Sequence, residues 1–260
     1  MDLQLGGKLA LVTGSTAGIG FAIAEALAKE GARVIVNGRT QKRVDEAVAK
    51  LAGNHVEGLA ADLGTAAGAE ETIRRFPDVE ILVNNVGIYE VKPFEQIPDA
   101  DWLRLFEVNV MSGIRLSRHY LPRMKERNWG RIVFISSESG VQIPSEMVHY
   151  GMTKSAQLAI SRGMAETTAG TGVTVNAVLP GPTESEAVGG FVENLAAQRN
   201  TDRATIEAEF FRSVRPSSLL KRFARADEVA AMVAFICSPL SSATNGAAIR
   251  VDGGVVRSIV

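Results

Sequence analysis

The sequence predicts a doubly wound α/β fold, in which helices cover both faces of a parallel sheet, from three observations. Short apolar runs rich in β-branched residues alternate with longer helical patterns along the chain. Several of these runs lack polar alternation, which is typical of parallel strands buried on both faces. The regular alternation of run and helix implies right-handed crossovers, which place successive strands in one sheet.

The predicted elements follow one another in regular order. The strands are predicted at Leu9–Thr13, Arg33–Asn37, Val56–Ala61, Ile81–Asn84, Arg131–Ser136, Val173–Leu179 and Ala248–Val251. The helices are predicted at Ile19–Glu30, Gln41–Ala52, Ala66–Phe76, Asp99–Arg127, Met147–Ala169 and Asp227–Cys237. No repeat or linker interrupts them, so residues 1–260 are predicted to form one domain.

Residues 183–222 break this rhythm, because no strand pattern is found there. Gly189-Gly190, Phe210-Phe211 and scattered charges indicate short helices. An insertion of this length in a compact fold is usually functional or mobile, and we expect it to shape the substrate site. Its acidic and basic residues are equal in number, so its charge says nothing about the substrate.

The composition indicates an ordinary globular protein. The 260 residues are 46% hydrophobic with a formal net charge of -1, which gives no general attraction for nucleic acids or anionic membranes. Cys237 is the single cysteine, so an intrachain disulfide is excluded and no metal site is expected. Because no leader and no apolar stretch of about twenty residues is visible, we expect a cytoplasmic protein without membrane contact.

A glycine-rich loop, TGSTAGIG, lies between the first predicted strand and the first helix. Glycines let the backbone turn tightly and approach a ligand, and the following helix points free N–H groups at a phosphate. Three residues separate Gly14 from Gly18, unlike the common G-x-G-x-x-G, so the loop alone could be turn chemistry. Its position favours a nucleotide site. Cofactor contacts are predicted for Gly14, Ser15, Thr16, Gly18, Ile19 and Gly20.

The end of the second strand bears on the choice of cofactor. Gly38-Arg39 lacks the acidic residue that binds the ribose hydroxyls of NAD, and Arg39 offers a cation to the 2′-phosphate of NADP. We therefore expect NADP(H), with NAD(H) possible; a solvated loop arginine is the alternative. Asp62 and Leu63, after the third strand, either meet the adenine or cap the next helix.

Further polar positions follow the fourth strand. Asn84-Asn85-Val86-Gly87 places an amide and a flexible residue beside the expected cofactor. The same turn could hold neighbouring strands together, and both roles are compatible. Contacts with the cofactor are predicted for Asn85 and Gly87.

Tyr150 and Lys154 form the sharpest pair in the sequence. They stand at i and i+4 of a predicted helix, which places their Cβ atoms about 5–6 Å apart on one face. A free tyrosine is a poor acid–base catalyst at neutral pH, and we expect the Lys154 ammonium to lower the Tyr150 pKa. An isolated pair of this kind is usually structural. Because Ser137 lies at the exit of the preceding strand and a glycine loop is also present, we favour a catalytic role for this pair.

These residues together resemble the short-chain dehydrogenase/reductase family over nearly the whole chain. The matching motifs are TGSTAGIG, NNVG in place of the commoner NNAG, Asn109, Ser137, the Y-x-x-x-K of Tyr150 and Lys154, PGPT at 180–183 and VDGG at 251–254. The resemblance implies a seven-stranded Rossmann sheet. It also implies a homotetramer, built from the helices predicted at Asp99–Arg127 and Met147–Ala169 and from the last strand.

The resemblance also implies a role for each site residue. Tyr150 would serve as acid or base, and Lys154 would hold the nicotinamide ribose. Ser137 would orient the substrate oxygen, and Asn109 would help to position a water for proton relay. Contacts with the nicotinamide end are implied for Pro180, Gly181 and Thr183. Of the neighbouring residues, Glu138 is expected to face solvent at a helix start, and His149 is expected to line the pocket wall.

The predicted activity is NADP(H)-linked hydride transfer between nicotinamide and a carbonyl or secondary alcohol, with the substrate left open. A 3-oxoacyl carrier-protein reductase is the alternative within the family. Its support is the basic stretch of Arg118, Arg123, Lys125, Arg127 and Arg131, which could also be a solvated helix end. Against it, Thr171 stands where those reductases often carry a basic residue. A non-catalytic NADP-binding sensor or scaffold is the alternative of another class, and a methyltransferase leaves the Tyr150–Lys154 pair unexplained.

Overall fold

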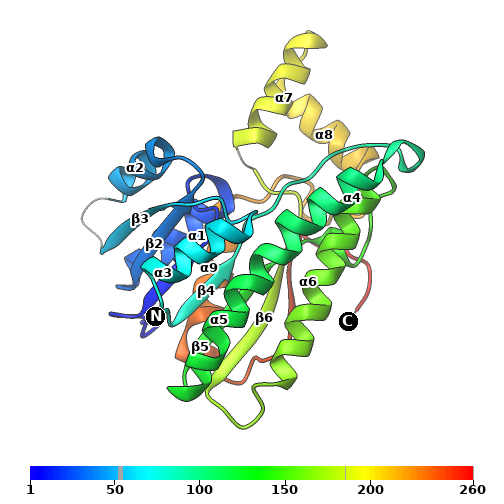
Figure 1. Cartoon of the computed structure of the whole chain (residues 1–260). Coiled ribbons are helices and arrows are strands. Elements are labelled where there is room, and N and C mark those ends of the chain that lie inside the picture. Colours follow the sequence, from blue (N-terminus) through cyan, green and yellow to red (C-terminus); the bar gives the residue numbers. More distant parts are fainter. Residues whose placement is uncertain (52–54, 185, 260) are drawn as a thin grey trace.

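The structure, a computed structural model, describes residues 1–51, 55–184 and 186–259. Within these residues, seven parallel strands form one sheet in the order β3-β2-β1-β4-β5-β6-β7 (Figure 1). They are β1 Leu9–Val12, β2 Arg33–Gly38, β3 Val56–Ala60, β4 Ile81–Asn84, β5 Gly130–Ile135, β6 Val173–Pro180 and β7 Ala248–Val251. The strand order reverses between β1 and β4, so ligands are expected at the carboxyl ends of these strands. The predicted fold class is confirmed.

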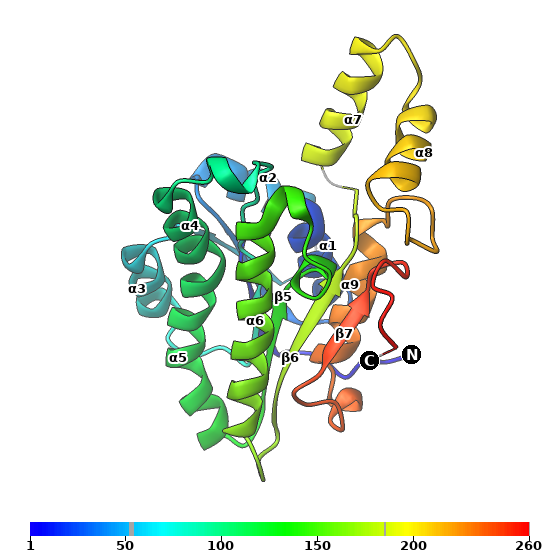
Figure 2. The same ribbon diagram turned by 90° about the vertical axis from the view of Figure 1, so that its right-hand side faces the viewer.

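Two helical layers bury the sheet (Figure 2). One face carries α1 (Gly18–Lys29), α2 (Gln41–Lys50) and α9 (Ala226–Cys237), and the other carries α3 (Ala66–Arg75), α5 (Ser112–Glu126) and α6 (Val148–Glu166). Side chains of β1 alternate between the two cores, with Ala10 and Val12 in the first and Leu11 in the second. Both faces are apolar, which explains why the strand runs lack polar alternation.

The helix predicted at Asp99–Arg127 is interrupted. The structure divides it into α4 (Asp99–Phe106), a π-helical turn η2 (Glu107–Met111) and α5. The hydrophobic pattern does not reveal the turn, because the residues that flank it keep right-handed helical dihedral angles. The end predicted for α2 at Ala52 lies outside the described residues. Single turns of 3-10 helix are η1 Phe94–Gln96, η3 Glu138–Gly140, η4 Ser145–Met147 and η5 Pro239–Ser241.

The segment after β6 stands above the carboxyl edge of the sheet (Figures 1 and 2). It contains the expected short helices, α7 (Glu186–Gln198) and α8 (Arg203–Ser213). These helices share a small core separate from the two main ones, formed by Ala196, Ile206, Phe211 and Phe223. A β-bridge between Thr183 and Ala224 closes its base. No helix in the described ranges has the length and apolarity needed to cross a membrane.

Candidate active site

The loop between β1 and α1 has the shape of a phosphate cradle. Gly14 and Gly18 have φ values of 61° and 57°, which glycine adopts without strain. A Cβ at Gly20 would lie 2.5 Å from both the Gly14 carbonyl oxygen and Asn85 Nδ2. Helix α1 has Ala17 at its N-cap, and among the described residues no capping side chain or first-turn carboxylate occupies its N–H groups. The pyrophosphate of a dinucleotide therefore fits this helix start.

Asn37, which the sequence reasoning missed, holds the cradle in place from the end of β2. Its Oδ1 accepts a hydrogen bond from the Gly14 N–H at 3.0 Å, and its Nδ2 donates to the carbonyls of Leu59 and Ala61. Its N–H donates to Ser15 Oγ, which donates in turn to the last carbonyl of β1. The Ser15 hydroxyl is thus engaged within the protein. No local sequence signal marks such a cross-strand role.

The Asn-Asn turn after β4 holds neighbouring strands together, which is one of the two roles considered for it. Asn85 Nδ2 donates to the carbonyls of Thr13 and Gly14 at 2.9 and 3.1 Å. The N–H groups of Asn85 and Val86 both donate to Thr13 Oγ1. Asn85 and Gly87 also line the large cavity described below. The turn therefore joins β1 to β4 and shapes the cavity as well.

The residues expected at the adenosine end lie outside that cavity. Arg39 is exposed directly after β2. Asp62 does not cap α3, because its Oδ1 accepts from the Gly64 N–H and Thr65 is the N-cap. The capping alternative for Asp62 is therefore wrong, and its adenine contact stays a prediction. The Leu63 side chain belongs to one of the two main cores.

Ser137, Tyr150 and Lys154 meet above the carboxyl end of β5. Ser137 follows that strand directly, and α6 carries Tyr150 and Lys154 one turn apart. The Ser137 side chain lies close enough to Tyr150 to act on its pKa, and Lys154 Nζ lies 5.6 Å from the Tyr150 ring centroid. The three predicted residues therefore stand together at the rim of the sheet.

Asn109 joins this group through the π-helical turn η2. Its Nδ2 donates to the Ile88 carbonyl at 2.9 Å and to Thr153 Oγ1 at 3.0 Å, while its Oδ1 accepts from the Ile88 N–H at 2.7 Å. Its own carbonyl accepts from Gln157 Nε2 at 2.6 Å. Such turns are frequent at functional sites, because the extra residue redirects a side chain. Here the side chain ties the loop after β4 to α6.

Burial dominates the ionisation of the central pair. Lys154 Nζ donates to the Ile135 carbonyl at 2.9 Å and to Gln157 Oε1 at 3.2 Å, and burial lowers the pKa of Lys154 to about 7. Burial also raises the pKa of Tyr150 above its ordinary value of 10, and the Ser137 side chain lowers it only in part. The expectation that Lys154 lowers the Tyr150 pKa is therefore wrong for the protein alone, because the lysine itself is partly neutral near pH 7.

A cavity of about 800 Å³ connects the glycine loop to these residues and to the α7–α8 segment. Ten of the predicted site residues line this cavity: Ile19, Gly20, Asn85, Gly87, Ser137, Tyr150, Lys154, Pro180, Gly181 and Thr183. Its far wall is mostly apolar and comes from Leu195, Ile206, Phe210, Val214 and Phe223. A nicotinamide cofactor with a substrate above it fits this arrangement.

The neighbour of Ser137 corrects one expectation. Glu138 was expected to face solvent, but it is only 4% exposed. Its Oε2 accepts hydrogen bonds from the hydroxyls of Ser137 and Ser139, both at 2.6 Å, and its Oε1 accepts from Arg215 Nε at 3.1 Å. Arg215 follows α8 and supplies the counter-charge that allows the carboxylate to be buried. The charge balance of residues 183–222 gave no signal for this contact.

His149 corrects another expectation. It was predicted to line the pocket wall, but it is fully buried and lies outside the cavity lining. Its ring packs edge-on against Trp102 of α4, with centroids 5.8 Å apart. Burial lowers its pKa. Although it precedes Tyr150 in the helix, its ring contacts Trp102 and does not line the cavity.

The basic stretch considered for a carrier protein is also not continuous. Arg131 is buried and donates to the carbonyls of Ser238 and Gly172, and Arg127 pairs with Asp78 at 2.6 Å. Helix α5 begins directly after the turn that holds Asn109 and extends from it for about 22 Å. The exposed cations at its far end therefore lie at the edge of the sheet opposite the cavity.

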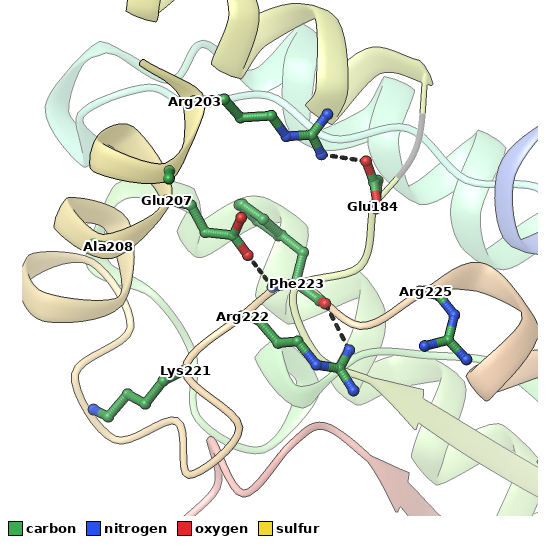
Figure 3. Close-up of a pocket in the computed structure, with 9 residues that line it drawn as sticks. Glu184, Arg203, Glu207, Ala208, Lys221, Arg222, Phe223 and Arg225 are labelled. Carbon is green, nitrogen blue, oxygen red and sulfur yellow. Dashed lines mark hydrogen bonds and ion pairs between the residues drawn. The ribbon is translucent and has the colours of Figure 1, made fainter. Parts of the chain in front are cut away.

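A second pocket, of about 410 Å³, lies at the base of the α7–α8 segment (Figure 3). Its arginines are paired within the protein: Arg203 with Glu184, and Arg222 with Glu228 at 2.8 Å. Glu207 accepts from the Phe223 N–H at 2.8 Å. These contacts fasten α8 to the chain that enters and leaves the segment. Within the described residues, no cluster of three or more His, Cys, Asp or Glu could hold a metal ion.

The chain belongs to the short-chain dehydrogenase family, whose family model, described as short chain dehydrogenase, matches residues 8–196. The uncharacterized oxidoreductase YvaG of Bacillus subtilis is 49% identical over 263 residues, covering 100% of both chains. The 3-oxoacyl-[acyl-carrier-protein] reductase FabG of Aquifex aeolicus is 34% identical over 98% of this chain and 100% of that protein. The L-sorbose reductase of Gluconobacter frateurii, solved with NADPH and L-sorbose, matches with a TM-score of 0.91 over 100% of both chains at 31% identity. The predicted family is confirmed, and the protein is an oxidoreductase of that family.

Proposed function

We propose that the protein transfers a hydride between NADP(H) and a carbonyl or secondary alcohol, with Tyr150 as general acid and base. The observation that carries the proposal is the single cavity that joins the glycine loop to Ser137, Tyr150 and Lys154. A phosphate cradle at one end and a proton-transfer group at the other are what such chemistry requires. The NADPH in the matched sorbose reductase supports the choice of cofactor.

The bound cofactor would supply or accept the hydride, and the residues of the chain would handle the proton and the substrate oxygen. Because burial raises the pKa of Tyr150, its phenol keeps its proton at neutral pH and can donate it during carbonyl reduction. Ser137 would accept a hydrogen bond from the same substrate oxygen once that oxygen carries the proton. Lys154 would hold the nicotinamide ribose, and Gln157 links its ammonium to the Asn109 carbonyl.

The first experiment is a screen of carbonyls and alcohols with NADPH, NADP, NADH and NAD, following nicotinamide absorbance. Sugars and other polyhydroxylated ketones belong in the screen because of the sorbose reductase, and 3-oxoacyl thioesters because of the carrier-protein reductase. Turnover with any of them supports the proposal. Cofactor binding without turnover across the panel would favour a non-catalytic sensor or scaffold instead.

Arg39 provides the test of cofactor preference. It is exposed at the end of β2, where an acidic residue would select NAD. Arg39→Asp is expected to shift the ratio of kcat/KM for NADPH over NADH by about a hundredfold toward NADH, because it removes a phosphate contact and adds a repulsive charge. Arg43→Asp, one turn further on in α2, is the control for a general change of charge. An unchanged ratio in Arg39→Asp would contradict the role given to Arg39.

The carrier-protein reductase is the second candidate, and the sequence similarity favours it. The interrupted basic stretch speaks against docking of an acidic carrier on α5. A cytoplasmic homotetramer, built through the α4–α5 and α6 helices and the edge strand β7, also remains a proposal. Sedimentation would test the assembly, and a monomeric mass would refute it.

A further inference from the structure

A buried ion pair joins the reaction centre to the α7–α8 segment. The Glu138 and Arg215 side chains are 5% and 10% exposed, and 3.1 Å separates Glu138 Oε1 from Arg215 Nε. Both residues line the cavity. They lie 77 positions apart in the chain, so the pair exists only when the segment is closed against the sheet. Burying two charges costs free energy that a pair of apolar side chains would not, so stability alone does not explain this pair.

One oxygen of Glu138 determines where the Ser137 hydroxyl points. A serine hydroxyl has a single proton, and in the structure that proton is donated to Glu138 Oε2 at 2.6 Å. The Ser139 N–H donates to Ser137 Oγ at 3.1 Å, and the Ser139 hydroxyl donates to the same oxygen of Glu138. One lone pair of Ser137 Oγ is thereby left, for Tyr150 or for a substrate oxygen bearing a proton.

The other oxygen of Glu138 holds the substrate segment. Besides its bond to Glu138, Arg215 donates through Nη1 to Glu146 Oε1 in η4 at 3.1 Å. A single guanidinium thus reaches both η3 and η4, the two turns that precede α6. Ser217, two residues further on, donates to the Val255 carbonyl at 2.7 Å. The chain after α8 is therefore fastened directly beside Tyr150.

We propose that Glu138 and Arg215 are positioning residues of the reaction. One oxygen of Glu138 orients the Ser137 hydroxyl, and the other anchors the chain after α8, so that closure over the substrate and alignment of the serine depend on the same carboxylate. The proposal rests on the proposed function. We expect loss of the Ser137 orientation to lower kcat and loss of the segment's anchor to raise KM, because only the orientation of Ser137 acts on the reacting oxygen.

Two double variants separate the two roles. Arg215→Met alone would leave Glu138 buried without a counter-charge and endanger folding, so both charges are removed together. E138Q/R215M keeps an oxygen that can accept from Ser137, whereas E138L/R215M does not. Both are expected to raise KM for the best alcohol of the screen about tenfold, the effect of losing one charge-assisted hydrogen bond. Only E138L/R215M is expected to lower kcat as well, by about thirtyfold.

The matched control is E71Q/R74M, which removes an exposed Glu–Arg pair on α3 and is expected to leave kcat and KM unchanged. Equal kcat values in the two Glu138 variants would overturn the orienting role. Hydrogen exchange of the α8 amides with NADPH present is the readout independent of turnover: faster exchange in both Glu138 variants than in the wild type is expected, and unchanged exchange would overturn the anchor. A wild type without turnover would refute the proposed function, while the exchange experiment would still decide the anchor.

Discussion

Tyr150→Phe is expected to lower kcat by about a thousandfold while leaving the Kd for NADPH within about twofold of the wild type. Phenylalanine keeps the ring that packs edge-on against Tyr89, with centroids 6.2 Å apart, and removes only the hydroxyl, whose pKa Ser137 influences. Single-turnover absorbance changes measure the loss of chemistry, and NADPH fluorescence measures the binding.

Tyr120→Phe is the matched control for that loss. Tyr120 is a fully buried tyrosine, and burial raises its pKa as well, but its hydroxyl donates to the Phe76 carbonyl far from the cavity. The control variant is expected to lose about 1 kcal/mol of unfolding free energy and to keep the full activity of the wild type. Full activity in Tyr150→Phe would refute the role of Tyr150.

The raised Tyr150 pKa also predicts the pH dependence of the two directions. Alcohol oxidation requires the phenolate, so its kcat/KM is expected to rise with pH throughout the alkaline range. Carbonyl reduction uses the protonated phenol, which is already the dominant form at neutral pH. An oxidation rate that is independent of pH in the wild type would contradict this assignment.

Lys154→Met is the second variant for which we expect a large loss of activity. The variant should lower kcat/KM by at least a hundredfold, because the ammonium at the centre of the site disappears together with its bonds to Ile135 and Gln157. NADPH binding should also weaken, in contrast to Tyr150→Phe. Retained activity and retained NADPH affinity would together refute the role of Lys154.

The same variant changes how stability depends on pH. Burial lowers the pKa of Lys154 from 10.5 to about 7 in the folded protein, so between these two values the unfolded chain holds a proton that the folded protein has released. The free energy of unfolding of the wild type therefore gains from this group as pH rises from about 7 to 10.5. Below pH 7 the cost of burying the charge is fully present.

Methionine has no charge to bury, so the stability of Lys154→Met relative to the wild type should be most favourable near pH 6 and should decline toward pH 10. Urea unfolding of both proteins at several pH values measures this difference. In thermal unfolding, each kcal/mol of it would shift Tm by about 2–4 °C. Lys125→Met, which removes an exposed lysine near the end of α5, should show no such trend. A difference that does not vary with pH would contradict the burial of an uncharged amine.

Local pattern was enough to predict the strands and the glycine loop. Every strand begins and ends within one residue of its predicted bounds, because parallel strands buried on both faces are marked by unbroken apolar runs. The pairing of Tyr150 with Lys154 was equally accessible, since a spacing of four residues in a helix determines which face is shared. Helix ends and interruptions were less accessible, and η2 left no trace in the pattern.

The roles that the sequence missed depend on partners far along the chain. Asn37 looks like an ordinary strand-end amide until β1 and β3 are placed on either side of it. His149 is adjacent to Tyr150 in sequence, yet the helix turns it toward Trp102. In each case the decisive contact is made across elements, so neither periodicity nor spacing could reveal it.

The sequence by itself determined the strands, the glycine loop and the pairing of Tyr150 with Lys154, because each depends on residues within a few positions of one another. Only the tertiary structure decided how these groups ionise and what surrounds them. Burial, which no sequence pattern measures, sets the direction of the pKa changes at Tyr150 and Lys154. The burial of Glu138 beside Ser137 requires the charge of Arg215, which the fold brings there from 77 positions away.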